Sequence, residues 1–226
     1  MDLVIRQTAG CSGKYRLCQY EKIWTGPKIK ISDLPLWCKL KKDEILHKQN
    51  KLRYVVNWSK TYFNPRYAEQ RKSMAKTFKG GKLLVLFAGV GPIACTLSKN
   101  YQHIHCVEWN KIAVSLAATN FKLNKISNVT IECCDAYQYV KNIHYGLYED
   151  CITFSPTCQD LIVGLLAKKV SRLVHYKIVK DDQLKKTLKN FLKFGRVKCR
   201  RAKEYCKNFG IYQFIINFNN AINFLN

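Results

Sequence analysis

Apolar residues along the chain fall into segments of two kinds, and these alternate from about residue 80 onward. Short apolar runs are typical of buried strands, whereas apolar positions three and four residues apart are typical of amphipathic helices. The predicted strands are 83–87, 104–108, 129–134, 151–156 and 172–179. The predicted helices are 92–99, 111–123, 157–170 and 181–194. Because strands that alternate with helices form parallel sheets, the pattern predicts an α/β fold.

Two more strand-like runs, 197–205 and 211–220, close the chain around a turn at 208–210. Strands joined by a short turn pair antiparallel, so we expect an antiparallel edge on the parallel sheet. Asp181 has the residue type of a cap for the helix that precedes these strands. A doubly wound sheet that ends in this way suggests the Rossmann-like architecture of S-adenosylmethionine-dependent methyltransferases.

The first eighty residues have a different pattern. Strand-like stretches lie at 14–22 and 52–58. Asn64 and Pro65 then have the residue types of a helix cap and a first helical position. The glycines in 79–82 read as a linker before the first parallel strand. We therefore predict a small α+β domain that ends in a connecting helix, followed by a Rossmann-like domain, with the boundaries 1–78 and 79–226.

The charge of the chain is strongly positive: 39 Lys and Arg against 15 Asp and Glu give a net charge of +24. Such an excess favours a polyanionic partner such as nucleic acid. An AT-rich genome that enriches Lys, Asn, Ile and Tyr is the alternative explanation. The clusters most suited to phosphate contacts are Arg66, Arg71 and Lys72 near the predicted cap, and the segment 196–203 near the end.

The 11 cysteines have irregular spacings and form no Cys-x-x-Cys pair, so we expect reduced thiols and no metal site. No apolar run reaches the roughly 18 residues that cross a bilayer, so we expect no membrane association. The first ten residues resemble neither a secretory signal nor an import peptide. We expect a cytoplasmic monomer; the nucleus and the mitochondrion remain alternatives.

Chemistry-bearing residues follow three successive predicted strands. Gly89 and Gly91 of "FAGVGP" follow the first strand, Glu108 ends the second and Asp135 follows the third. In open α/β sheets ligands bind at the carboxyl ends of the strands, where an acid can accept the ribose hydroxyls of a nucleoside. No Gly-Lys-Ser/Thr follows the turn, so a triphosphate is not indicated. The three positions favour S-adenosylmethionine as the cofactor.

The segments "YFNPRYAEQRKSMAK", "LFAGVGPIA", "EWNKIAVSLAATNFKLNKISN" and "CDAYQYV" resemble, in this order, the archaeal and eukaryotic tRNA (guanine-N1)-methyltransferase family. The resemblance extends over nearly the whole chain, and because it starts within the first twenty residues we expect the chain to lack the small amino-terminal domain of the family. It implies methyl transfer from S-adenosylmethionine to N1 of guanosine 37 in the anticodon loop of tRNA. The anticodon stem-loop of a tRNA is accordingly the expected partner.

The resemblance also assigns residues. It places the cofactor on the positions Phe87, Gly89, Gly91, Glu108, Trp109, Asp135, Ala136 and Pro156. It places the reacting guanine beside the positions Tyr62 and Arg66, and we expect Glu69 and Arg16 to serve in place of two catalytic positions that differ from the family. We expect the base to be extruded from the RNA and to stack on Tyr62 or Phe63.

Several positions depart from the family pattern. The catalytic glutamate of the family aligns with Gln70, and Glu69 precedes it by one residue; an amide cannot take the N1 proton, whereas a carboxylate can. An Asp of the family is Val85 here. The Asn of its Asn-Leu-Pro motif is Phe154, which either stacks on the base or only packs. The guanine-binding arginine falls at Cys18, with Arg16 two residues away.

Two other functions remain open beside the methyltransferase. The departures motivate a tRNA-binding homologue without catalysis. The order Glu108-Trp109-Asn110 resembles related transferases that move the aminocarboxypropyl arm of the same cofactor onto a wybutosine precursor. An assay with labelled cofactor and unmodified tRNA would distinguish the three functions.

Overall fold

The computed structural model describes residues 34–154, 159–206 and 208–218. Its centre is a seven-stranded sheet with the order β5-β4-β3-β6-β7-β9-β8. The strands are β3 (Gly80–Leu86), β4 (Tyr101–Glu108), β5 (Val129–Cys133), β6 (Asp150–Phe154), β7 (Arg172–Lys180), β8 (Arg196–Cys206) and β9 (Phe209–Asn217). The first five are parallel, and β9 pairs antiparallel with both β7 and β8. The predicted parallel sheet with an antiparallel edge is confirmed.

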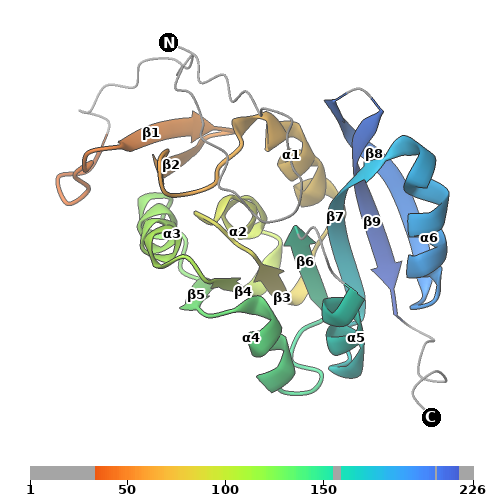
Figure 1. The fold of residues 1–226 in the computed structure, drawn as a ribbon. Helices are drawn as coiled ribbons and strands as arrows, with labels where there is room; N and C mark the ends of the chain where they lie inside the picture. The colour runs from red at the N-terminus through yellow and green to blue at the C-terminus, as the bar shows by residue number, and fades with distance from the viewer. Residues whose placement is uncertain (1–33, 155–158, 207, 219–226) are drawn as a thin grey trace.

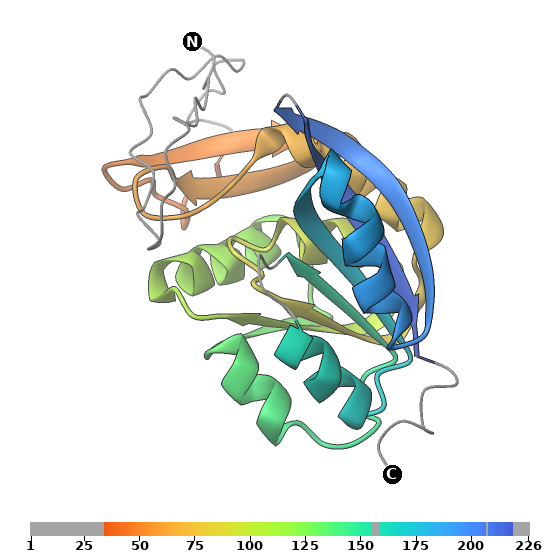
Figure 2. The ribbon, with the colours of Figure 1, turned by 45° about the vertical axis from the view of Figure 1, so that its right-hand side comes forward.

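Helices cover both faces of this sheet (Figures 1 and 2). They are α1 (Ala68–Thr77), α2 (Pro92–Leu97), α3 (Lys111–Leu123), α4 (Ala136–Asn142), α5 (Gln159–Ala167) and α6 (Leu184–Leu192). Residues of α1, α2 and α3 share one hydrophobic cluster with the sheet, and residues of α4, α5 and α6 share the other. The fold is therefore a three-layer, doubly wound α/β structure.

The order of the strands reverses beside β3. The chain first adds β4 and β5 on one side of β3 and then returns to add β6 on its other side. In open α/β sheets, ligands bind outside the carboxyl ends of the strands at such a reversal, which here lies between β3 and β6. The topology thus favours a ligand site at the carboxyl end of β3.

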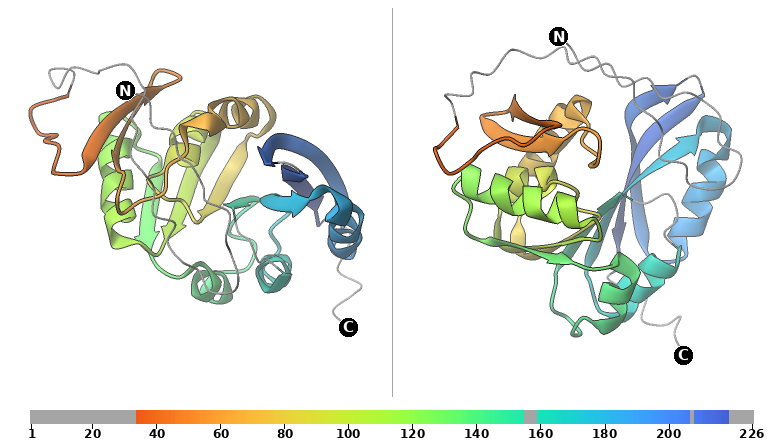
Figure 3. Two further views of the ribbon diagram at one scale, coloured as in Figure 1. Left: turned by 45° about the horizontal axis from the view of Figure 1, so that its top comes forward. Right: turned by 60° about the vertical axis from the view of Figure 1, so that its left-hand side comes forward.

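A hairpin of β1 (Glu44–Gln49) and β2 (Leu52–Asn57) lies over α3 (Figure 3). Two amides of α3 bind the outer edge of β2 as a neighbouring strand would. Asn120 accepts from Val55 N (2.6 Å) and donates to Val55 O (3.1 Å). Asn124 accepts from Arg53 N (2.8 Å) and donates to Arg53 O (2.7 Å). Because these amides satisfy the backbone of an edge strand, the hairpin is fixed on the helix.

The Asn64 cap is also confirmed, although it begins the short 3₁₀ turn η2 (Pro65–Tyr67) that leads into α1. Its side chain accepts a hydrogen bond from Arg66 N (2.9 Å). Two other details of the prediction were wrong. The glycines of 79–82 are not a linker, because β3 begins at Gly80. Asp181 does not cap the following helix: its carboxylate accepts from Arg201 Nη2 (3.1 Å) and Tyr212 OH (2.8 Å).

One hydrophobic cluster crosses the predicted domain boundary at residue 78. It joins Tyr54 of β2, Met74 of α1 and Phe78 to Val85 of β3 and Ile104 of β4. In the described part of the chain, the hairpin and α1 thus share a core with one face of the sheet. None of the described helices is both long and apolar enough to cross a bilayer.

Candidate functional site

The turn after β3 combines backbone strain with a close approach of two helices. Phe87 has a φ of 56°, which costs a residue with a Cβ about 1 kcal/mol or more. Such strain concentrates at functional sites. Gly91 has a φ of 81° and is the cap of α2. A Cβ on Gly91 would lie 2.6 Å from Cε1 of Phe121, so only glycine lets α2 pack against α3 here.

Glu108 ends β4 and is held by the turn beside it. Its Oε2 accepts from Gly89 N (2.8 Å) and its Oε1 accepts from Asn110 N (3.0 Å). The side chain of Asn110 in turn caps α3 and donates to Lys60 O (2.9 Å). A carboxylate offers about four acceptor positions, so two remain for a ligand. The residue is buried, and its orientation is fixed before any ligand arrives.

Asp135 follows β5 and caps α4. Its Oδ1 accepts from Tyr137 N (2.9 Å) and Gln138 N (3.0 Å). Its Oδ2 has no hydrogen-bond partner within the described residues, and the side chain is exposed. Cys134 N donates to Glu108 O (3.1 Å), which holds the ends of β4 and β5 together.

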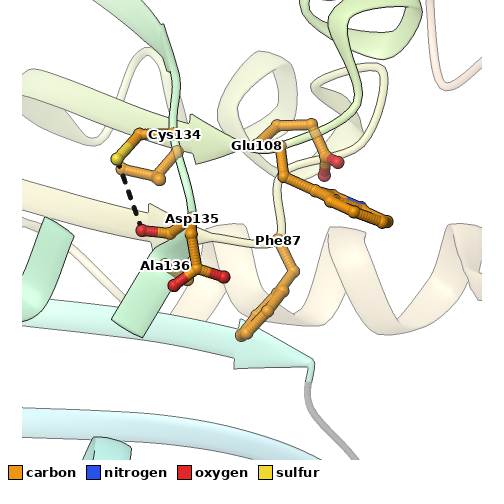
Figure 4. A pocket seen from close by; sticks show the side chains of 7 residues that line it. Phe87, Glu108, Cys134, Asp135 and Ala136 are labelled. Carbon is orange, nitrogen blue, oxygen red and sulfur yellow. Dashed lines mark hydrogen bonds between the residues drawn. The ribbon is translucent and has the colours of Figure 1, made fainter. Parts of the chain in front are cut away.

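A pocket opens between these strand ends (Figure 4). Its volume is about 220 Å³, and Phe87 and Glu108 lie on one side of it with Cys134, Asp135 and Ala136 on the other. The full lining is Phe87, Val107, Glu108, Trp109, Cys134, Asp135 and Ala136. Five predicted cofactor residues are brought together here; of the predicted glycines, Gly89 holds Glu108 and Gly91 supports α2.

Two lining residues, Val107 and Cys134, were missed by the sequence interpretation. Both directly precede predicted residues at strand ends, so their position next to Glu108 and Asp135 was the available signal. Trp109 is 78% exposed although it lines the pocket. A large exposed aromatic ring beside a pocket is suited to stacking on a flat ligand.

A second group of predicted residues lies on the loop between β2 and α1. Tyr62 is 61% exposed. Its carbonyl oxygen is 3.5 Å from where a Cβ of Gly89 would stand, so this loop adjoins the turn after β3. Phe63 was expected to stack on a base, and that prediction was wrong: it is buried beside the rings of His47 (5.2 Å) and Tyr54 (5.4 Å).

Gln49 and Arg71 hold the turn that carries Arg66. Gln49 Nε2 donates to Pro65 O (2.6 Å), Arg71 Nη1 donates to Asn64 O (3.3 Å), and Arg71 Nη2 donates to Gln49 Oε1. The prediction that Arg71 contacts phosphate was wrong, since the residue is buried. Burial lowers the pKa of its guanidinium, while the neighbouring tyrosines raise it. Arg66 is exposed.

Glu69 and Gln70 begin α1 and have different surroundings. Glu69 is exposed. Gln70 is half-buried, and its Nε2 donates to Ala202 O of β8 (3.2 Å). Its Oε1 is buried without a hydrogen-bond partner among residues 34–154, 159–206 and 208–218. Gln70 is thus oriented by the antiparallel edge of the sheet, and its amide oxygen is left for another donor.

Phe154, at the end of β6, lies in a column of rings. It stacks on Tyr176 (centroids 4.5 Å apart, 4° between planes) and on Tyr67 (5.8 Å, 27°). Because Tyr176 and Tyr67 already stack on the ring, Phe154 makes packing contacts within the protein. Of the two interpretations of this residue, packing is the one that the geometry supports.

Three residues of the sequence analysis remain: Val85, Arg16 and Pro156. Val85, where the family pattern has an acid, is fully buried in β3. Arg16 and Pro156 lie outside the described residues.

Comparison with known proteins decides the family. Residues 45–202 match the family described as the TRM5/TYW2 methyltransferase domain. The chain belongs to this family. A tRNA (guanine(37)-N(1))-methyltransferase Trm5b of Methanocaldococcus jannaschii is 38% identical over 89 residues, which are 38% of this chain and 26% of that protein. A tRNA (guanine(37)-N(1))-methyltransferase of Anopheles gambiae is 25% identical over 80% of this chain and 31% of that protein.

Solved structures of the family are similar as well. The structure of M. jannaschii Trm5 in complex with adenosine has a TM-score of 0.66 and 26% identity, over 78% of this chain and 55% of that one. A complex of aTrm5 and tRNALeu has a TM-score of 0.69 and 25% identity, over 96% of this chain and 61% of that one. The chain thus spans about a quarter to a third of the length of the curated family members named above.

Proposed function

We propose that the chain transfers the methyl group of S-adenosylmethionine to N1 of guanosine 37 in the anticodon loop of a tRNA. The observation that carries the proposal is the pocket at the ends of β3, β4 and β5, where Glu108 is held in place by Gly89. Family membership supports the reaction, and the net charge of +24 supports a nucleic-acid substrate.

The residues of the pocket fit the nucleoside part of the cofactor. The two remaining acceptor positions of Glu108 suit the two ribose hydroxyls. Oδ2 of Asp135 suits the exocyclic amine of adenine, and Trp109 and Phe87 offer rings on which adenine packs. When bound, S-adenosylmethionine supplies an electrophilic methyl group. The strand ends orient that group, and the pocket shields part of it from water.

The residues near the reacting base fit less completely. Attack by N1 of guanine releases the N1 proton, which a positioned carboxylate takes in an efficient enzyme. Glu69 is the carboxylate closest in sequence to Gln70, and it points to solvent. The side chain of Gln70 is an amide with a buried oxygen, and it cannot hold the proton. Methyl transfer by this chain is therefore slow, because solvent has to remove the proton.

A second candidate function is binding of tRNA and cofactor without turnover. Two observations favour it. Gln70 is anchored to Ala202 rather than free to exchange places with Glu69, and Phe154 is enclosed by Tyr67 and Tyr176. The amide nitrogen of Gln70 and the ring of Phe154 are thus committed to contacts within the protein.

The test measures binding and chemistry separately. Calorimetry with S-adenosylmethionine measures binding of the cofactor to the pocket. An assay with methyl-labelled cofactor and unmodified tRNA transcripts measures methyl transfer. We expect heat of binding, and label in 1-methylguanosine that disappears when the transcript carries adenosine at position 37. Tight tRNA binding without label supports the second candidate. Absence of cofactor binding contradicts the proposal, and so does transfer of label to the tRNA from a second cofactor preparation that is labelled in its carbon chain.

A further inference from the structure

A cationic stripe runs along the outer side of α6. It is formed by Lys185, Lys186, Lys189 and Lys193, which are all exposed. Within the described part of the chain, none of the four has a carboxylate partner. Lys186 and Lys193 are two turns apart, so the stripe is roughly 10 Å long.

The sequence around the stripe contains no compensating acid. After Asp182 the next acidic residue is Glu204, and nine Lys and Arg lie between them. Two of these, Arg200 and Arg201, are exposed but make hydrogen bonds to Ser73 and to Asp181 of the same chain. An ordinary solvated helix carries charges of both signs, whereas every charged residue between Asp182 and Glu204 is positive.

The stripe has an energetic cost in the free protein. Lys185 and Lys189, and Lys189 and Lys193, are like charges four residues apart, and such pairs destabilise a helix. Lys185 and Lys186 also lie in the first turn of α6, where positive charge opposes the helix dipole. A bound polyanion removes both penalties.

The other side of α6 excludes a membrane as that polyanion. Phe191 is buried and packs on Phe214 (4.7 Å) and His175 (5.8 Å). Leu184 and Leu188 pack against the same hydrophobic cluster. An amphipathic helix binds a lipid surface by inserting its apolar face, and this face is already used in the core of the protein.

The position of α6 connects the stripe to the pocket. The helix follows β7 through the 3₁₀ turn η3 (Asp181–Gln183), so it begins at the edge of the sheet where the parallel strands have their carboxyl ends (Figure 2). β7 is two strands from β3, and strands are about 4.8 Å apart. β7 also runs five residues past the end of β3, because Leu86 is level with His175 and β7 ends at Lys180, so the start of the stripe is roughly 20 Å from the site.

We infer that the stripe binds backbone phosphates of the same RNA that presents the target base. The inference rests on the proposed function, and it assigns α6 to RNA binding beside the pocket. The stripe holds the stem that flanks the base by sequence-independent phosphate contacts, and the pocket determines the chemistry.

The test compares two triple variants of the full chain. The first is Lys186→Gln, Lys189→Gln and Lys193→Gln. The matched control is Lys76→Gln, Lys99→Gln and Lys141→Gln, which removes the same charge from exposed positions at the opposite, amino-terminal edge of the sheet. Affinity for an unmodified tRNA transcript is measured by fluorescence anisotropy at several salt concentrations, and cofactor binding by calorimetry.

We expect the stripe variant to lose roughly 10-fold or more in RNA affinity and to reduce the slope of log K against log salt by about 2 to 3. The control variant changes either quantity by less than half as much, and both variants bind the cofactor as the wild type does. Equal losses in the two variants overturn the inference.

Two other outcomes are distinguishable. Wild-type protein that binds cofactor but no RNA contradicts the proposed function itself. Binding to phosphatidylserine vesicles that depends on Lys186, Lys189 and Lys193, with unchanged RNA affinity, overturns the inference and assigns the stripe to a lipid surface.

Discussion

The two halves of the candidate site differ in how much of their hydrogen-bonding capacity remains for a ligand. On the cofactor half, Glu108 and Asp135 are oriented by backbone N–H groups and still have acceptor positions free. On the acceptor half, Gln70 donates to Ala202 and has only its buried amide oxygen unpaired among the described residues, and Phe154 stacks on Tyr67 and Tyr176. The first half is prepared to bind, and the second is largely occupied by its own protein.

The difference shows that binding a cofactor and using it are separable. Orienting an acidic side chain for ligand binding requires only the ends of the strands and the turns that follow them. Every doubly wound fold provides these. Proton removal needs one carboxylate at one place, and it is lost when a single residue changes from Glu to Gln. Selection for binding alone would preserve the cofactor half and leave the acceptor half free to change.

The largest expected effect is a gain of function on the acceptor half. Gln70→Glu places a carboxylate where the amide lies, and general-base catalysis is worth roughly 100- to 10,000-fold in rate. We expect an increase in this range in the initial rate of 1-methylguanosine formation. Glu69→Gln is the matched control and leaves the rate unchanged. An unchanged rate in the first variant and a loss in the second would assign the base to Glu69.

A smaller loss is expected on the cofactor half. Glu108→Gln keeps the shape of the side chain but removes the charge that strengthens its hydrogen bonds to backbone and ribose. Charge-assisted bonds contribute about 1.5–3 kcal/mol, so the Kd for S-adenosylmethionine rises roughly 10- to 150-fold. Calorimetry measures the Kd of each variant. Glu132→Gln, an exposed change on β5, serves as the control, and equal effects of both would contradict the role of Glu108.

The third test uses the thiol in the pocket. Cys134 lines the pocket and Cys133 beside it is exposed, whereas Cys95, Cys106 and Cys151 are buried. Cofactor at ten times its Kd should slow alkylation of Cys134 by N-ethylmaleimide about 10-fold, because only the unbound protein reacts. Peptide mass spectrometry follows each thiol separately. Cys133 is the internal control. Equal protection of Cys133 and Cys134 would indicate a conformational change instead of direct shielding of Cys134 by the cofactor.

The smallest effect concerns stability in acid. His175 is fully buried on β7, beneath the acceptor half; burial, and then the charge of Lys177, lowers the pKa of its imidazole to about 3. The unfolded chain takes up this proton below its ordinary pKa of 6.5. Stability therefore falls as the pH falls from 6.5 toward 3, by about 1.4 kcal/mol per pH unit.

Urea unfolding between pH 7 and pH 5 checks this slope. His47, whose pKa burial lowers to about 4, adds a second contribution of the same sign. His175→Phe keeps an aromatic ring beside Phe191 and Phe214 and should remove about half of the pH dependence. An unchanged slope in this variant would show that His175 does not protonate on unfolding.

Much of the fold could be predicted because the apolar pattern is strong where burial is complete. The helix at 111–123 has the predicted limits, since Asn110 caps it and apolar residues recur on one face. The pattern failed where a side chain distant in sequence decides the structure. Gly80 and Gly81 belong to β3 because Glu149 packs over them, and Asp181 binds Arg201 and Tyr212 across the sheet.

The candidate site, like the fold, could be predicted only in part. The sequence placed Glu108 and Asp135 at strand ends, where the structure also has them, because the end of each strand can be recognised from its own residues. Their role in binding a cofactor stays a prediction. The sequence left open whether Phe154 stacks on a base, and it misplaced Phe63 and Arg71. Their roles depend on Tyr67, Tyr176, His47 and Gln49, which come from other elements. The proposed division of the chain at residue 78 stays a prediction.

The sequence by itself determined that this chain forms a doubly wound sheet with acids at successive strand ends, because hydrophobic periodicity and strand ends are local properties. Only the tertiary structure decided which of those groups still have unoccupied hydrogen-bond positions. Hydrogen bonds and ring contacts between distant segments, such as Gln70 with Ala202 and Phe154 with Tyr176, form only when the elements pack together.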